Sequence, residues 1–170
     1  MSNASDYARL RRLGVATLGV VSGLAVVASP LVAQAPQRDV IVTVRSVKAL
    51  DKLDVFSKAD FFAQATIAGG APIVSPVAKQ AEQITPNWSL VKRVAPGRHT
   101  IRLEIFDKDL TKNEPIDINR LPNKRALDFT IDTRNCFVGG FSQAHRCGDV
   151  IVRGGAENKK AEVAFTVEVR

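Results

Sequence analysis

Apolar and polar residues alternate with a period of two through most of the chain from residue 39 onward. In the clearest run Ile101, Leu103 and Ile105 are separated by Arg102 and Glu104. Such alternation is typical of strands with one face on a core and the other in water. The pattern predicts strands at residues 39–47, 61–68, 72–83, 88–94, 98–106, 127–131, 150–153 and 161–169.

Turn-forming pairs separate these runs. They are Gly69-Gly70, Pro86-Asn87, Pro96-Gly97, Asn123-Lys124 and Gly154-Gly155. No stretch has the 3.6-residue period of a long amphipathic helix, and only residues 77–83 admit a short one. Short strands at regular spacing with turn chemistry between them favour an all-β fold, an antiparallel eight-stranded β-sandwich.

The N-terminal segment has the pattern of a targeting sequence. Three arginines between residues 9 and 12 precede a stretch without charge that continues to Gln37. The small residues Ala33 and Ala35 frame a signal-peptidase site, and cleavage after Ala33 is the alternative to cleavage after Ala35. We therefore expect residues 1–35 to be a signal peptide.

The same apolar stretch is long enough to cross a bilayer, so an uncleaved N-terminal membrane anchor is the other interpretation. In either case residues 36–170 suit a single domain. The sequence thus predicts an exported protein, periplasmic or secreted, with a membrane anchor as the alternative.

The chain has two cysteines, Cys136 and Cys147. In an oxidising compartment, an even pair that closes a short loop is most simply a disulfide. A zinc site made with His145 is the rival interpretation, but it lacks a fourth ligand and the usual spacing between ligand pairs. We expect the disulfide.

Acidic residues gather after the runs at 39–47 and 98–106, in a chain whose formal net charge is +7. Carboxylates this close repel one another unless water or a cation lies between them, and calcium prefers six to eight oxygen ligands from flexible loops. The alternative is that these acids solubilise turns, neutralised by nearby lysines. The two groups are Asp51, Asp54 and Asp60, then Asp107, Asp109, Glu114 and Asp117.

This order of strands and acidic loops resembles the C2 domain, the calcium- and phospholipid-binding β-sandwich of protein kinase C and synaptotagmin. The resemblance is best over residues 39–120. Pro86 and Trp88 match the family's Asn-Pro-x-Trp turn. The resemblance implies calcium as the cofactor, bound by four matching aspartates: Asp54, Asp60, Asp107 and Asp109.

Two departures from the family pattern affect this site. Phe61-Phe62 stands where the family has Pro-Tyr after the second aspartate of the first loop. Pro115 stands where the last acidic ligand of the later loop belongs, so Glu114 or Asp117 would complete the calcium shell.

Apolar residues lie among the loop acids. Phe56 falls in the first acidic loop and Leu110 directly follows Asp109. The resemblance implies that such tips contact an anionic lipid membrane once calcium cancels the carboxylate repulsion. The alternative for Phe56 is a place in the core.

Other classes of function have weak support. The two histidines, His99 and His145, are not placed beside a nucleophile and a third catalytic member, so we expect no enzyme. Aromatic residues do not interleave with basic ones, as a nucleic-acid partner would require. The sequence predicts an exported calcium-binding module that attaches to a membrane or envelope surface. A metal-independent structural or protein-interaction sandwich, with an unknown protein partner, is the alternative.

Overall fold

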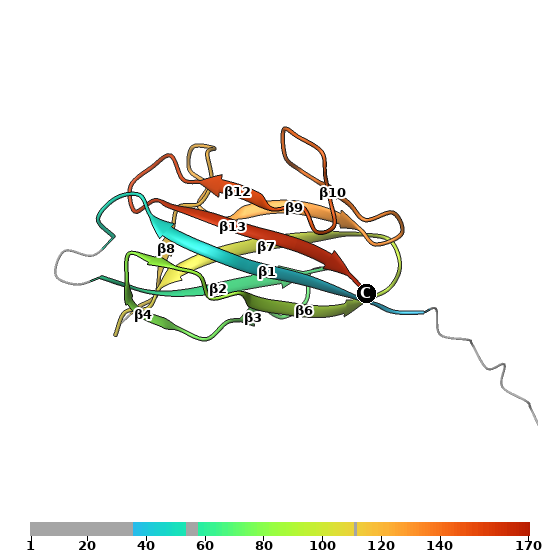
Figure 1. Ribbon diagram of the computed structural model, residues 1–170, viewed down its shortest axis with the longest axis horizontal. Coiled ribbons are helices and arrows are strands. Elements are labelled where there is room, and N and C mark those ends of the chain that lie inside the picture. The colour runs from blue at the N-terminus through green and yellow to red at the C-terminus, as the bar shows by residue number, and fades with distance from the viewer. Residues whose placement is uncertain (1–35, 54–57, 111) are drawn as a thin grey trace, which may run out of the picture. The chain divides into compact units, whose positions relative to one another are not determined.

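The computed structural model describes residues 36–53, 58–110 and 112–170, and residues 34–170 form one compact unit. Within the described ranges the chain forms thirteen strands and no helix (Figure 1). The strands are β1 (Arg38–Ala49), β2 (Ala59–Ile67), β3 (Ile73–Val74), β4 (Ala78–Ala81), β5 (Gln83–Ile84), β6 (Trp88–Val94), β7 (Arg98–Asp107), β8 (Glu114–Ile116), β9 (Leu127–Asp132), β10 (Phe137–Gly139), β11 (His145–Arg146), β12 (Ile151–Gly154) and β13 (Ala161–Val169).

The strands make two antiparallel sheets. The first is five-stranded, with the order β12-β13-β1 and with both β5 and β6 pairing the other side of β1. The second is eight-stranded and runs β11-β10-β9-β7-β2, with β3 and β4 on β2 and with β8 on β7. The predicted all-β antiparallel sandwich is therefore confirmed.

Alternation places one face of each long strand in the core between the sheets. Ile101, Leu103 and Ile105 of β7 are almost completely buried, whereas Arg102 between them is exposed. The ring of Phe165, from the other sheet, lies 5.4 Å from that of Phe129. Burying a large apolar side chain contributes about 1.5–3 kcal/mol, so these contacts are the main stabilising term.

The structure divides the expected strand at residues 72–83 into three short ones and contains no helix at 77–83. Pro76, between β3 and β4, lacks a backbone N–H for sheet pairing. Gln80, within β4, has a φ of 49°, and the pairing of β4 with β2 is irregular. Strands β8, β10 and β11 were missed by the periodicity because two or three residues are too few to show alternation.

The strand registers define two ends of the sandwich. Ala49 pairs with Ala161, and Phe61 pairs with Asp107, which brings the described residues 50–53, 58, 108–110, 112–113 and 155–160 to one end. We call this the loop end; it lies on the left in Figure 1. The other end carries β10, β11 and the bond between Cys136 and Cys147, and we call it the disulfide end.

Candidate functional site

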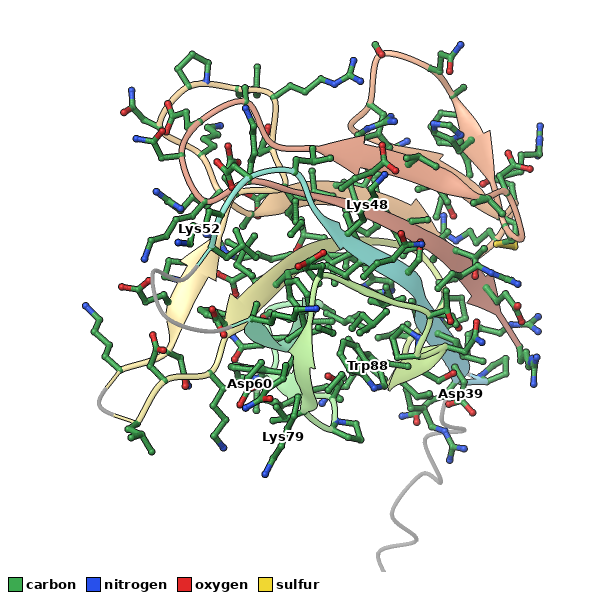
Figure 2. All side chains as sticks on the ribbon, turned by 60° about the vertical axis from the view of Figure 1, so that its left-hand side comes forward. Asp39, Lys48, Lys52, Asp60, Lys79 and Trp88 are labelled. Atoms are coloured by element: carbon green, nitrogen blue, oxygen red, sulfur yellow. A yellow bond between two sulfur atoms is a disulfide. The ribbon has the colours of Figure 1, made fainter. Side chains whose placement is uncertain are left out.

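Asp60 and Asp107 lie side by side at the loop end, where β2 begins and β7 ends. The amide N–H of Asp60 donates to Oδ1 of Asp107 (2.7 Å), and the amide of Lys108 donates to the carbonyl of Asp60 (3.0 Å). Oδ1 of Asp60 accepts the amide N–H of Gln80 on β4 (2.7 Å). Figure 2 labels Asp60 and Lys79, the residue before Gln80. Two of the predicted calcium ligands, from segments far apart in sequence, are thus neighbours.

The chain after Asp107 is in solvent, from Lys108 to Leu110. Asp109 is exposed, and the Leu110 side chain is fully exposed. Exposed lysines flank them at positions 108 and 112. Asp54 and Phe56, the remaining predicted ligand and membrane contact of the first loop, lie outside the described residues.

Glu114 is brought close to the Asp107 position by strand pairing. On β8 it stands directly opposite Asp107 of β7, and its carboxylate forms an ion pair with Lys159. Asp51 uses its carboxylate differently, because Oδ1 accepts the amide N–H of Lys160 (2.9 Å). Both acids therefore link the loop end to the β12–β13 connection.

Asp117 is placed in the interior and has partners of its own. Its side chain is fully buried and accepts the amide N–H groups of Asn119 (2.9 Å), Ala156 (2.9 Å) and Glu157 (2.7 Å). A carboxylate held by several backbone donors is stable without a cation. We therefore leave Asp117 out of the ligand set proposed below.

This clamp around Asp117 was not visible in the sequence. A Cβ atom at Gly155 would lie 2.2 Å from the Asp117 carbonyl oxygen, so the backbone needs a glycine there. The only signal was the Gly154-Gly155 pair, which sequence reasoning assigned to a simple turn.

Among the described residues, no group of three or more acids, histidines or cysteines is arranged to hold a metal ion. Asp60, Asp107 and Glu114 supply oxygen donors of the type that calcium binds. Each of the three also holds a backbone N–H or a lysine, so this part of the site keeps its form through protein contacts. A calcium shell would need further oxygens from the first loop.

Phe61 and Phe62 replace the family's Pro-Tyr without disturbing the strand. Phe61 is completely buried in the core, and Phe62 stacks on Phe106 of the neighbouring strand, with ring centroids 5.1 Å apart. The pair therefore anchors the start of β2, next to Asp60.

At the disulfide end the two cysteines are bonded, as the sequence predicts. Their sulfur atoms are 2.10 Å apart and their Cα atoms 5.2 Å apart. His145 lies on β11, where Nε2 is 3.5 Å from a guanidinium nitrogen of Arg153 and the ring makes an edge contact with Phe141. A disulfide is typical of an oxidising compartment.

No helix within the described residues is long and apolar enough to cross a membrane.

Comparison with known proteins gives a fold relationship and no closer relative. No family model matches the sequence, and no curated protein matches it. A solved C2 domain superposes with a TM-score of 0.53 at 10% identity, covering 79% of this chain and 98% of that one. The tandem C2 domains of extended synaptotagmin 2 give a TM-score of 0.54 at 16% identity, covering 90% of this chain and 47% of that one.

A human GIVD cytosolic phospholipase A2, solved with methyl gamma-linolenyl fluorophosphonate, also superposes, with a TM-score of 0.51 at 14% identity. The match covers 79% of this chain but only 17% of the phospholipase, so this chain spans about a sixth of that enzyme's length. At these identities the comparisons show the fold alone. The resemblance to C2 domains is confirmed for the fold.

Proposed function

We propose that this protein is an exported C2-like module whose loop end attaches to an anionic membrane or envelope surface, with calcium as the bridging ion. The observation that carries this proposal is the full exposure of Leu110, directly beside Asp109 and between two lysines. An apolar side chain of this size presented entirely to water suits a surface that buries it.

Three forces would act together at the loop end. Burying Leu110 in the bilayer contributes about 1.5–3 kcal/mol. Each lysine near an anionic leaflet adds about 1 kcal/mol, and Lys108 and Lys112 are both exposed. Calcium would cancel the repulsion between the carboxylates and the lipid. Asp54, Asp60, Asp107, Asp109 and Glu114 are the proposed ligands, and Phe56 is the proposed second membrane contact.

The test is flotation with vesicles of phosphatidylcholine and phosphatidylglycerol, in calcium and in chelator. Leu110→Ala should weaken binding about tenfold, as loss of most of a buried leucine would. Val150→Ala is the matched control: Val150 is exposed too, but it precedes β12 near the disulfide end. Equal binding by both variants and the unmodified protein would contradict membrane insertion at the loop end.

Calcium dependence is tested separately with Asp109→Asn. Asp109 is exposed, so its neutral isostere should preserve the fold while removing a ligand. Glu162→Gln, an exposed acid on β13, controls for the change in net charge. Binding that is equal in calcium and chelator for all three proteins would remove the calcium part of the proposal.

A metal-independent module is the second candidate, and one observation favours it. Four of the described acids at the loop end are held by protein contacts: Asp51, Asp60 and Asp107 by backbone amides, and Glu114 by Lys159. Such a loop end needs no cation to keep its shape, and it would meet a protein or lipid partner directly. A thermal melt unchanged by millimolar calcium would favour this candidate, because a ligand of the native state raises the melting temperature.

A further inference from the structure

A pocket of about 280 Å³ opens beside the loop end, between the β7–β8 loop, β8 and the β12–β13 connection. It is lined by Lys112, Asn113, Glu114, Pro115, Arg125 and Lys159. Three cations from separate segments therefore surround one space, against a single carboxylate.

Contacts within the protein fix two of these cations. Nη1 of Arg125 donates to the carbonyls of Pro115 (2.9 Å) and Asn158 (3.2 Å), which holds the guanidinium at the pocket wall. Lys159 is paired with Glu114, which neutralises the one acid. The backbone of Lys159 has a φ of 57°, in the left-handed region that residues other than glycine seldom adopt.

Positive charge is left uncompensated after these contacts. Arg125 and Lys112 have no ion pair with an acid within residues 36–53, 58–110 and 112–170, and Nε and Nη2 of Arg125 make no hydrogen bond there. A guanidinium with two nitrogens available forms bidentate bonds to phosphate oxygens, and an ammonium adds a point charge.

We propose that this pocket binds a phosphate monoester, the group carried by a phosphorylated lipid headgroup. A phosphate monoester presents three oxygens and a charge of about −1.5 to −2, which matches the Arg125 fork and the Lys112 ammonium better than a singly charged diester does. The pocket wall at Lys112 is two residues from the exposed Leu110. If Leu110 enters a bilayer, the pocket would lie at the depth of the lipid headgroups. The choice of a lipid as the carrier of the phosphate therefore rests on the proposed function.

The experiment measures binding of the full chain to vesicles containing phosphatidic acid or phosphatidylglycerol, in chelator so that calcium makes no contribution. Lys112→Gln and Arg125→Lys are the test variants, and Arg125→Lys keeps the charge while removing the fork. Lys124→Gln is the control, an exposed lysine next to Arg125 in sequence that does not line the pocket. Urea midpoints show whether Arg125→Lys alters the fold.

We expect phosphatidic acid binding to fall about fivefold with Lys112→Gln and about tenfold with Arg125→Lys, the range for charged contacts and hydrogen bonds. Binding to phosphatidylglycerol should change no more than with Lys124→Gln. The proposal would be overturned if Lys112→Gln and Lys124→Gln weakened binding equally, and did so for both lipids. General surface charge would then explain the binding.

A second experiment, with a soluble ligand, distinguishes a lipid headgroup from a free phosphate monoester. Glycerol 3-phosphate is titrated into the protein and followed by amide chemical shifts at Asn113 and Lys159. Shifts there without vesicle binding would support the pocket and refute the membrane role. Vesicle binding insensitive to Lys112→Gln and Arg125→Lys, with no shifts in the soluble arm, would refute the pocket and leave the proposed function standing.

Discussion

The two ends of this sandwich are fastened by different chemistry. At the loop end, carboxylates hold the connections: Asp51, Asp60 and Asp117 all accept backbone N–H groups. At the disulfide end Asp132 and Asp149 also accept backbone N–H groups, but a covalent bond and aromatic packing are added, with the ring of Phe141 5.3 Å from that of Phe129. The described connections of the loop end are therefore held by non-covalent contacts alone, whereas the disulfide end also has a covalent cross-link.

Two charged side chains, those of Asp117 and Arg153, are buried or half-buried without an ion pair to a described residue. Asp117 is a fully buried carboxylate stabilised by backbone donors at the loop-end side. Arg153, half-buried near β10 and β11, stacks over Phe141 at 4.4 Å and donates to the carbonyl of Val152 (2.7 Å). Burial, together with the neighbouring charge of Arg120, lowers the pKa of Arg153. Backbone hydrogen bonds hold Asp117, and a ring contact and a backbone hydrogen bond hold Arg153.

The largest effect should come from breaking the clamp at Asp117. Asp117→Asn replaces an acceptor by a group that presents N–H to buried N–H donors, so at least one backbone amide loses its partner. We expect a loss of about 3–5 kcal/mol in the free energy of unfolding, as hydrogen bonds to a buried charge are removed. Urea denaturation measures it. A loss below about 1 kcal/mol would show that the clamp does not hold the loop end.

Opening the disulfide should destabilise the fold somewhat less. The bond joins residues 11 apart, and a short loop of this kind is worth about 2–4 kcal/mol in the loop-entropy account. The double variant Cys136→Ser with Cys147→Ser should lower the free energy of unfolding by that amount, measured by urea denaturation. Its vesicle binding should stay unchanged, because the loop end is fastened independently. Loss of vesicle binding in a variant that remains folded would show that the two ends are coupled.

A smaller loss is expected at Gly155. In Gly155→Ala the added methyl would meet the Asp117 carbonyl oxygen at 2.2 Å, so the β12–β13 connection must move. Forced shifts of this type cost about 1–3 kcal/mol. Thermal or urea unfolding measures the loss, with Gly69→Ala compared because a Cβ there meets nothing within 4 Å. Gly69 has a φ of 64°, which alanine adopts less readily than glycine. A greater loss of unfolding free energy for Gly69→Ala than for Gly155→Ala would mean that the backbone conformation, and not the space for a methyl group, determines which residue these turns accept.

The smallest effect concerns pH at the start of β1. The hydrogen bond from Arg93 (3.0 Å) lowers the pKa of Asp39 below its usual 3.8; desolvation opposes this shift, and the charge of Arg93 adds to it. A lowered folded pKa gives stability above the unfolded pKa that is lost as pH falls through the folded value. Arg93→Gln should return the Asp39 pKa towards 3.8, and an NMR titration measures it. An unchanged pKa would mean that the pair does not form in solution.

Periodicity predicted the long strands well because burial on one face determines every second residue. Trp88–Val94 forms β6 as expected, and residues 98–106 fall within β7. The acidic clusters predicted that Asp60 and Asp107 would meet, because the C2 resemblance supplied the strand order that pairs them.

Other features of the site depend on contacts that sequence spacing does not encode. Asp117 was predicted as a possible ligand, but its partners Ala156 and Glu157 are about forty residues away and pair with it through the fold. The pocket that we propose for a phosphate group likewise joins Lys112, Arg125 and Lys159, whose spacing has no recognisable period. Local pattern cannot reveal such long-range backbone hydrogen bonds.

The most direct test of the account is amide hydrogen exchange of the protein with calcium, in the presence and absence of vesicles of phosphatidylcholine and phosphatidylglycerol. Protection by a surface reports which amides lose access to solvent. The account predicts slower exchange at residues 108–110 and 112–113, and unchanged exchange at β10 and β11. Protection at the disulfide end, or on a sheet face with the loop end unchanged, would contradict it.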